Sequence, residues 1–215
     1  TKSYKEHLLR SALVVSGTFL FVTGLRFLPL AEAISIAFAG PLFITALASS
    51  MLGEKIGWRR WIGVLIGFIG ILIIFRPGSS IFQWAALFPL AASCTGAFRD
   101  ILTRRMSVTD TNEALLFYST IAVMLGGLAT ALFGGWKIVI FSDWLLFGLT
   151  GRLIGGAHFL MIEAFRCCEA ALVAPFKYAS VLWALFFGYF MFGDMPEINT
   201  LVGGAVVISS GIYIL

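Results

Sequence analysis

Residues 30–75 read LAEAISIAFAGPLFITALASSMLGEKIGWRRWIGVLIGFIGILIIF, two apolar runs that are separated by a short step of glycine and charged residues. Each run approaches the roughly 20 residues that an α-helix needs to cross the hydrocarbon core of a bilayer. The step opens with MLGE (residues 51–54), and a similar MFGD (residues 191–194) ends another apolar run 140 residues later. The stretch therefore predicts a pair of membrane-spanning helices and indicates that the pair occurs twice in the chain.

The composition of the chain indicates which solvent surrounds it. Of 215 residues, 60% are apolar and only 12% are charged, and the mean hydropathy is +0.97. Soluble domains carry about 45–50% apolar and about 25% charged residues. Because so little charge cannot solvate a globule of this size, lipid must contact most of the surface.

Apolar segments of membrane-spanning length recur along the whole chain. Eight of them lie at roughly residues 7–25, 30–52, 57–75, 82–103, 113–133, 144–165, 171–192 and 199–215. A buried helix of a soluble protein could imitate one such segment, but not eight in series. We therefore expect an all-α membrane protein, a polytopic bundle of eight transmembrane helices.

Lysine and arginine predict the orientation of this bundle. With the N-terminus placed in the cytoplasm, nine of them fall on the inner side and three on the outer side, as the positive-inside rule requires. The inner set is Lys2, Lys5, Arg10, Lys55, Arg59, Arg60, Arg104, Arg105 and Arg166, and the outer set is Arg26, Arg76 and Lys137. We expect a multi-pass protein of the plasma membrane, a bacterial inner membrane, with both termini cytoplasmic. The net charge of +4 is then a topology signal, and no nucleic-acid binding is expected without a water-exposed basic domain.

A shift of 140 residues, without any gap, aligns the first three segments with the last three. The matches include Arg26 with Arg166, Met51 with Met191, Gly53 with Gly193, Gly63 with Gly203, and the acids Glu54 with Asp194. We interpret the two arginines and the glycines of the Gly-acid steps as helix C-terminal features, and the two acids as acceptors for the N–H groups that open the next helix. Equivalent spans are five apart, an odd number, so they cross the bilayer in opposite directions. This pattern is an inverted-topology repeat, which is frequent in secondary transporters.

The repeat also divides the chain into two parts. Residues 1–78 would form the first repeat with three helices, and residues 79–215 the second repeat with five. The second repeat thus has two spans, at 82–103 and 113–133, that the first one lacks. We therefore expect the chain to be part of a protein with ten helices, in which two further spans precede Thr1.

Two longer stretches resemble a known family. They are LRFLPLAEAISIAFAGPLFITALASSMLGEKIGWRRWIGVLIGFIGILIIFRPG (residues 25–78) and AALVAPFKYASVLWALFFGYFMFGDMPEINTLVGGAVVISSGIYIL (residues 170–215). Each combines a proline-interrupted span, a Gly-acid turn and a glycine-rich last span, and in this it resembles the EamA-type branch of the drug/metabolite transporter superfamily. The resemblance implies ten helices, cytoplasmic termini and transport by alternating access.

Ionisable side chains inside the predicted spans are the first candidates for function, because each costs about 2.5–3.5 kcal/mol on membrane-insertion scales. The candidates are Glu32, Arg152, His158, Glu163 and Lys177, with Arg99 and Asp100 at a span edge. At the offset of 140, the first five align with uncharged residues. An architectural charge should recur in both halves, so this asymmetry favours a role in binding solute or ions.

Several of these charges also have a purely structural interpretation. Glu32 could cap the start of its helix, and Arg99 with Asp100 could form a solvated helix end. Glu163 and Lys177 flank one predicted turn, where they could form a structural ion pair. These interpretations stand beside a role in the solute pathway.

Two of the candidates, Arg152 and His158, lie deeper in the sixth predicted span. Arg152 precedes Glu163 by eleven residues, about three helical turns, so both lie on one helical face that must meet protein or water. His158 lies on another face, where it could be a buried imidazole or could carry protons.

Prolines and aromatic residues give a second indication of the pathway. Pro41 and Pro175 interrupt corresponding spans of the two halves, and such interruptions tend to border the central site of a transporter, although a plain kink is the alternative. Phe176, Tyr178 and Trp183 could line an apolar cavity that stacks a planar or amphipathic solute.

These features favour one function over three others. We expect a secondary-active transporter that moves a small organic metabolite, such as an amino acid, a vitamin- or nucleoside-like compound or another amphipathic solute, by alternating access. No GxxxxGK pattern indicates an ATP site, so protons are the candidate coupling ion. A channel or a non-transporting scaffold is the alternative, and an intramembrane enzyme would need a catalytic constellation that the sequence lacks. No cofactor and no metal site are expected, and the protein would be a monomer or a homodimer; Arg152 and Lys177 indicate an anionic or zwitterionic solute.

Overall fold

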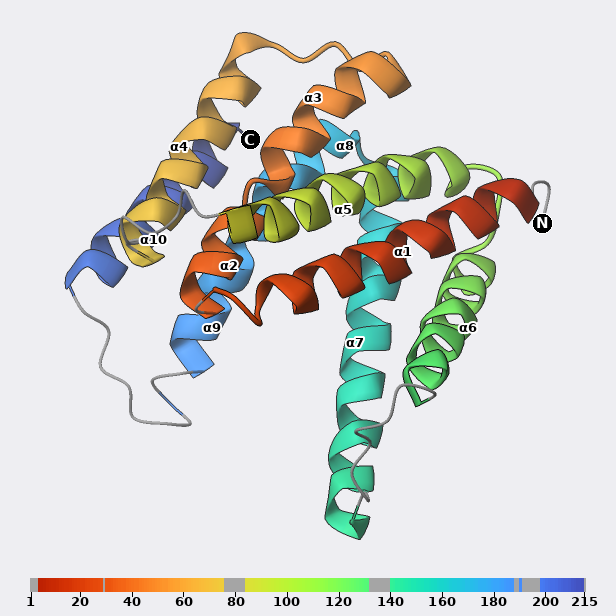
Figure 1. Cartoon of the computed structure of the whole chain (residues 1–215). Coiled ribbons are helices and arrows are strands. Elements are labelled where there is room, and N and C mark those ends of the chain that lie inside the picture. Colours follow the sequence, from red (N-terminus) through yellow and green to blue (C-terminus); the bar gives the residue numbers. More distant parts are fainter. Residues whose placement is uncertain are drawn as a thin grey trace.

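The computed structural model describes residues 4–28, 30–75, 84–131, 140–187, 190 and 198–214. Within these ranges the chain is helical and has no strand, which confirms the all-α membrane helix bundle (Figure 1). The helices in chain order are α1 (Tyr4–Gly24), α2 (Leu30–Ala37), α3 (Gly40–Leu52), α4 (Trp58–Phe75), η2 (Trp84–Ala86), α5 (Leu87–Met106), α6 (Asn112–Thr130), α7 (Phe141–Cys167), α8 (Ala170–Val173), η4 (Ala174–Tyr178), α9 (Ala179–Phe187) and α10 (Ile198–Ile214). Lys2, Arg76, Lys137 and the MFGD step at residues 191–194 lie outside the described residues.

Helices occupy the positions of the predicted apolar segments. In the described part of the chain, three are long and apolar enough to cross a membrane by themselves, namely Tyr4–Gly24, Asn112–Thr130 and Asp143–Cys167. Shorter apolar helices lie at Gly40–Leu52 and Leu201–Ser210. The expected number of eight spans stays a prediction.

Two of the predicted spans consist of consecutive short helices rather than one continuous helix. The segment 30–52 divides into α2 and α3, and the segment from residue 170 divides into α8, η4 and α9. Pro41 lies in the first turn of α3 and Pro175 in the first turn of η4. Proline has no N–H group and is tolerated where a helix begins, so each proline favours a new helix start inside a long apolar run.

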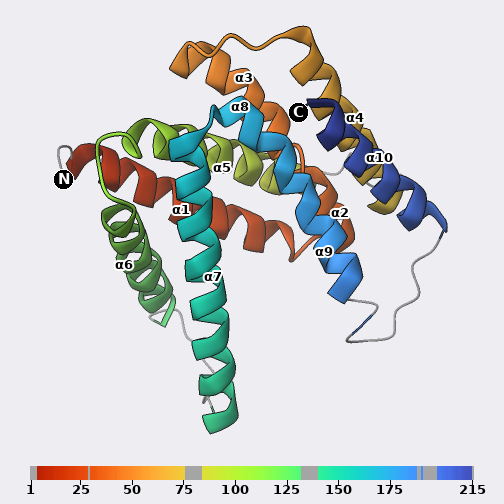
Figure 2. The same ribbon diagram turned by 180° about the vertical axis from the view of Figure 1, so that it is seen from behind.

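The helices form two groups, one of α1, α5, α6 and α7 and one of α4 and α10. The two groups meet at the spans that consist of short helices, α2–α3 and α8–η4–α9. α1 and α5 lie side by side through the middle of the molecule, α6 and α7 extend away from one side of them, and α4 pairs with α10 on the other flank (Figures 1 and 2). α4 and α10 run in opposite directions in both views. A Cβ atom added to Gly70 of α4 would lie 2.9 Å from Val207 and 3.0 Å from the carbonyl of Gly203, so small residues allow the two helices to approach closely.

The main apolar core lies where α3, α5, α7 and α8 converge. Its buried members are Ile44, Ala48, Ala97, Ile101, Phe165, Ala170, Ala171 and Ala174. Alanine is the most frequent residue in this core. Ala48 belongs to α3, and Ala170, Ala171 and Ala174 belong to the short stretch that includes α8. Their small side chains allow the backbones to approach closely. This cluster fills the bundle near the basic end, the name used here for the end that carries Arg60, Arg104, Arg105 and Arg166.

At the basic end, arginines bind backbone carbonyl groups that helix ends leave free. Arg104 Nη1 donates to the carbonyl oxygens of Phe165 (2.8 Å) and Arg166 (3.0 Å) at the end of α7. Arg166 lies in the last turn of α7, as expected, but its guanidinium donates to the carbonyls of Ser107 and Asp110, both at 2.8 Å. These bonds tie the end of α7 to α5 and to the turn that follows it.

The MLGE step ends one helix and caps another that is distant in the sequence. Gly53 has φ 69° and ψ 18°, the left-handed conformation expected of it. The carboxylate of Glu54 accepts from the N–H groups of Ala170 (2.9 Å) and Ala171 (3.1 Å), which open α8. The expectation that Glu54 serves the next helix, α4, is therefore wrong. The N-cap of α8, Glu169, makes no side-chain capping bond, so these N–H groups are free to take a carboxylate from another part of the chain.

Candidate solute-binding cavity

A cavity of about 700 Å³ lies between α1, the α2–α3 span, α5 and the η4–α9 span. Its wall is mainly apolar and includes Phe21, Phe38 and Phe176, with the hydroxyl groups of Thr18, Ser93 and Ser180 among the polar ones. The volume falls within the range of about 300–1,000 Å³ that is typical of sites for small molecules. The cavity therefore has the size and the lining of a site for an amphipathic organic compound.

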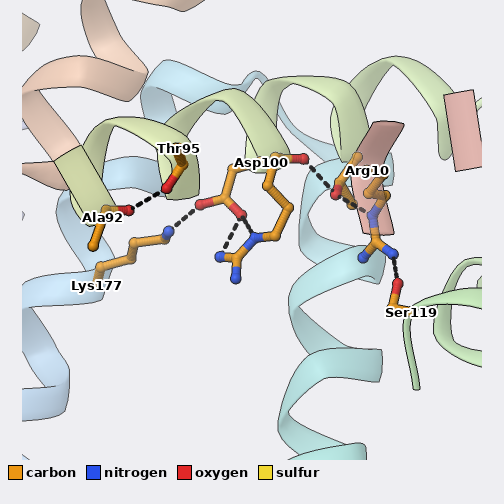
Figure 3. Close-up of polar contacts among 8 residues, drawn as sticks. Arg10, Ala92, Thr95, Asp100, Ser119 and Lys177 are labelled. Atoms are coloured by element: carbon orange, nitrogen blue, oxygen red, sulfur yellow. Dashed lines mark hydrogen bonds and ion pairs between the residues drawn. The ribbon is translucent and has the colours of Figure 1, made fainter. Parts of the chain in front are cut away.

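Three charged side chains form an ionic cluster in one wall of this cavity. Arg99 and Lys177 line the cavity, and the carboxylate of Asp100 lies behind them with an exposed fraction of 2%. Arg99 donates to Asp100 Oδ1 from Nε (2.9 Å) and from Nη2 (2.7 Å). Lys177 Nζ donates to the other oxygen, Oδ2 (Figure 3). One buried carboxylate thus holds two cations, which come from different spans, at the edge of the cavity.

A chain of hydrogen bonds fixes the α5 backbone that carries this cluster. Arg10 of α1 is buried and donates from Nε to Thr103 Oγ1 (2.8 Å), and Thr103 Oγ1 donates to the carbonyl of Arg99 (2.7 Å). Arg10 Nη1 also reaches Leu115 O (2.8 Å) and the hydroxyl of Ser119 on α6 (Figure 3). α1, α5 and α6 are therefore connected one turn beyond the ionic cluster.

One family model matches the chain, and several of its relatives are named as transporters. A model of the EamA-like transporter family matches residues 4–76. An S-adenosylmethionine uptake transporter of Rickettsia bellii is 31% identical over 211 residues, which cover 97% of this chain and 72% of that protein. The chain belongs to the EamA-like transporter family. Its predicted membership of the drug/metabolite transporter superfamily is confirmed.

Other relatives of this EamA-like chain have different names. A riboflavin transporter of Rhizobium johnstonii is 29% identical, with 98% of this chain and 70% of that protein covered. A riboflavin transporter of Vibrio cholerae is also 29% identical, and 100% of this chain and 72% of that protein are covered. One solved crystal structure superposes with a TM-score of 0.87 over 99% of this chain and 76% of its own, at 18% identity, and it supports the fold alone.

The cavity of the EamA-like chain brings together three of the residues that the sequence singles out. Lys177, Phe176 and Pro41 all line it. Tyr178 is fully buried behind the wall, where its hydroxyl donates to Val64 O (3.4 Å) and its ring packs with Ile71. Pro175 is likewise buried and is not among the lining residues, so it shapes the start of η4 without facing the cavity.

Three other candidates, Arg152, His158 and Trp183, are not among the residues that line the cavity, and a fourth, Glu32, has a side chain outside the described ones. Arg152 is exposed on α7 and has no hydrogen bond or ion pair among the described residues. His158 Nδ1 lies 3.0 Å from the carbonyl of Ile154 on the same helix. Trp183 is 62% exposed and makes an edge-to-face contact with Phe186 at 6.0 Å between ring centroids. Glu32 belongs to α2, but its side chain is not among those that the structure describes.

The structure corrects two of the structural interpretations. Glu163 and Lys177 do not pair, because Glu163 accepts from Asn112 Nδ2 and approaches Arg166 Nη1 at 3.6 Å, whereas Lys177 binds Asp100. A solvated helix end at Asp100 is also wrong. α5 continues to Met106, so Asp100 lies well inside the helix and Arg104 and Arg105 form its basic end instead.

Asp100 is the residue whose importance the sequence analysis underestimates. Its neighbour Arg99 has the opposite charge, which makes the pair look self-neutralised at a helix end. The sequence feature that could have identified Asp100 is its position inside a predicted span. A charge pair there should form hydrogen bonds with groups on other helices rather than with water. Which helix brings the third charge, Lys177, is decided by tertiary packing.

Proposed function

We propose that the chain is part of a secondary transporter that moves a small organic metabolite, and that the cavity between α1, α3, α5 and α9 binds the solute. The observation that carries this proposal is a mainly apolar cavity of about 700 Å³ with an ionic cluster in its wall. Relatives named as S-adenosylmethionine uptake and riboflavin transporters support it, since both compounds are small heterocyclic metabolites. Membership of the EamA-like transporter family supports it as well.

Transport would proceed by alternating access. Both predicted repeats contribute to the cavity wall, the first through α1 and the α2–α3 span and the second through α5 and the η4–α9 span. The apolar core at the convergence of α3, α5, α7 and α8 lies between this cavity and the basic end. A relative movement of the two predicted repeats would open that end while closing the opposite one.

The MLGE step supplies the contact that would hold the basic end closed. Glu54 caps α8, and Arg60 pairs with Glu169 immediately before α8, so the turn of one predicted repeat is joined to the turn of the other. In the proposed cycle these bonds break when the basic end opens. Weakening them should therefore change the balance between the two states without touching the solute site.

The proposal is tested by uptake into proteoliposomes that contain the purified protein. S-adenosylmethionine, riboflavin and a panel of radiolabelled amino acids and nucleosides are the solutes, and protein-free liposomes are the control. Saturable uptake of at least one solute, competed by its unlabelled form, is the expected result. Uptake that rises linearly with concentration for every solute would instead favour the channel-like alternative, and no protein-dependent uptake would contradict transport.

Coupling is tested in the same proteoliposomes, and membrane orientation is tested by a separate experiment. Protons stay the candidate coupling ion, and an imposed pH gradient across the proteoliposome membrane should accelerate uptake if they are used. Both termini are proposed to be cytoplasmic, and protease accessibility of a terminal tag in oriented vesicles tests that assignment. Among the described residues no cluster of three His, Cys, Asp or Glu side chains could hold a metal ion.

A further inference from the structure

The described side chains of the cavity wall carry more positive than negative charge. Two cations, Arg99 and Lys177, line the cavity, and among the described side chains Asp100 is the one carboxylate bonded to them. None of the described residues that line the cavity is acidic. The ionic cluster of Arg99, Asp100 and Lys177 therefore carries one formal positive charge in excess in a mainly apolar surrounding, where charge interactions are screened much less than in water.

The cations also keep donors that the described residues leave unused. An ammonium group has three N–H donors and a guanidinium has five. The hydrogen bonds to Asp100 use one donor of Lys177 and two of Arg99, and no further bonds of these side-chain nitrogens occur within the described part of the chain. Both side chains are partly exposed, at 26% for Lys177 and 21% for Arg99, so the remaining donors are open to the cavity.

Asp100 cannot serve the solute itself, because it is buried and both of its oxygens are already bonded. Its effect is to fix the two cations next to each other. A planar carboxylate presents two oxygens and matches the fork geometry of a guanidinium together with a neighbouring ammonium. The site is thus built for a carboxylate rather than for a cation.

We infer that the solute of this cavity is an amphipathic carboxylate, whose carboxylate is bound by Arg99 and Lys177 while its apolar body lies against Phe21, Phe38 and Phe176. The inference rests on the proposed function and specifies the substrate class of the same site. Asp100 acts as a positioning residue that sets the distance between the two cations. A solute with no anionic group, such as riboflavin, would leave the excess positive charge uncompensated.

Matched pairs of compounds test this recognition. Each pair consists of an aromatic carboxylate and its primary amide, for example indole-3-propionate with indole-3-propionamide and N-acetylphenylalanine with its amide. Binding is measured by the thermal shift of the detergent-solubilised protein and by inhibition of solute uptake into proteoliposomes. We expect the carboxylates to bind at least tenfold more tightly than the amides. Equal binding of both members, or no binding by any carboxylate, overturns the inference.

Two variants connect this preference to the cluster. Lys177→Met and Arg99→Gln each leave one cation to pair with Asp100, so the buried carboxylate keeps a partner. Both should reduce the ratio of carboxylate to amide affinity at least fivefold. Arg152→Gln removes an exposed arginine outside the cavity and is the matched control, with an unchanged ratio expected. Unchanged ratios in Lys177→Met and Arg99→Gln would overturn the assignment of these residues.

The outcomes separate this inference from the proposed function. If a neutral solute shows saturable transport that Lys177→Met does not change, the transport function is supported and the carboxylate site is rejected. Absence of transport for every solute, with carboxylates still binding preferentially, removes the transport function and keeps the site. The conservative variant Lys177→Arg should retain the preference for carboxylates, because the charge and the N–H donors persist. If Lys177 had only a structural role, the Lys177→Arg and Lys177→Met variants would show the same preference.

Discussion

The two proline-interrupted spans, α2–α3 and α8–η4–α9, are both divided into consecutive short helices, but their side chains differ in chemistry. Under the offset of 140 residues, Ala37 corresponds to Lys177 and Gly40 to Ser180, and all four line the cavity. The first span thus offers small, uncharged residues where the second offers a cation and a hydroxyl. We propose that the features common to the two spans build the cavity, and that the side chains that differ between them give it specificity.

The same offset also relates contacts within the structure. Phe38 and Tyr178 are equivalent positions, and their rings lie 6.0 Å apart. A Cβ added at Gly67 would lie 2.9 Å from Ser210, and one at Gly70 would lie 2.9 Å from Val207, two contacts that the offset of 140 exchanges. An inverted repeat requires such exchange about an axis between the two halves. The repeat itself stays a prediction, and superposition of the two helix triplets tests it.

The largest expected effect is on solute uptake, when the cation at position 177 of the second span is removed. Lys177→Ala should lower solute uptake about ten- to a hundredfold, because a hydrogen bond to a charged group contributes about 1.5–3 kcal/mol. Ala37→Ser, at the equivalent position of the other span, adds one hydroxyl to the cavity wall and removes no charged group, so uptake should stay within about twofold of wild type. Initial uptake rates in proteoliposomes measure both. Equal losses in the two variants would break the comparison.

A cation placed at position 37, which is uncharged in the first span, should be costly. Ala37→Lys brings a second ammonium group to the cavity wall, where Arg99 and Lys177 are already cationic, and insertion scales assign about 2.5–3.5 kcal/mol to such a charge in mid-membrane. We expect a lower thermal unfolding midpoint in detergent. Ala37→Met, which has a similar length and no charge, is the control and should unfold near wild type.

Packing behind the second span can be tested with glycine variants. In Gly67→Ala the new Cβ would lie 2.7 Å from the ring of Tyr178, and the rigid ring is fully buried, so overpacking should destabilise the protein by about 1–3 kcal/mol. Gly155→Ala on α7 is the matched control, since its Cβ meets nothing within 4 Å. Thermal unfolding should show a loss for the first variant and no loss for the second.

The smallest effect concerns the contact that joins the two turns at the basic end. Glu54→Ala removes the cap of α8 and should cost about 0.5–2 kcal/mol of stability. Arg60→Ala breaks a partly exposed ion pair with Glu169, for which about 0–1 kcal/mol is expected. Chemical denaturation in detergent distinguishes the two. A larger loss for Arg60→Ala than for Glu54→Ala would contradict the role assigned to the Gly-acid step.

Much of the fold was predictable because membrane helices are specified locally. A run of about 20 apolar residues must satisfy its backbone hydrogen bonds internally, so hydropathy alone places the helices. The left-handed end at Gly53 and the interruptions at Pro41 and Pro175 also follow from the properties of single residues. The family resemblance likewise depends on such local features, namely the prolines and glycines at which helices begin and end.

The partners of the charged residues depended on tertiary structure. Sequence spacing allowed Glu163 to pair with Lys177 and predicted that Glu54 would serve the helix next to it. In the structure Glu163 instead binds Asn112, and Glu54 binds the N–H groups that open α8. Sequence alone also favoured Arg152, which lies outside the cavity, over Asp100, which organises its ionic cluster. The cost of a charge in lipid can be read from the sequence, whereas the group that offsets this cost comes from whichever helix packs beside it, and that choice depends on contacts between residues far apart in the chain.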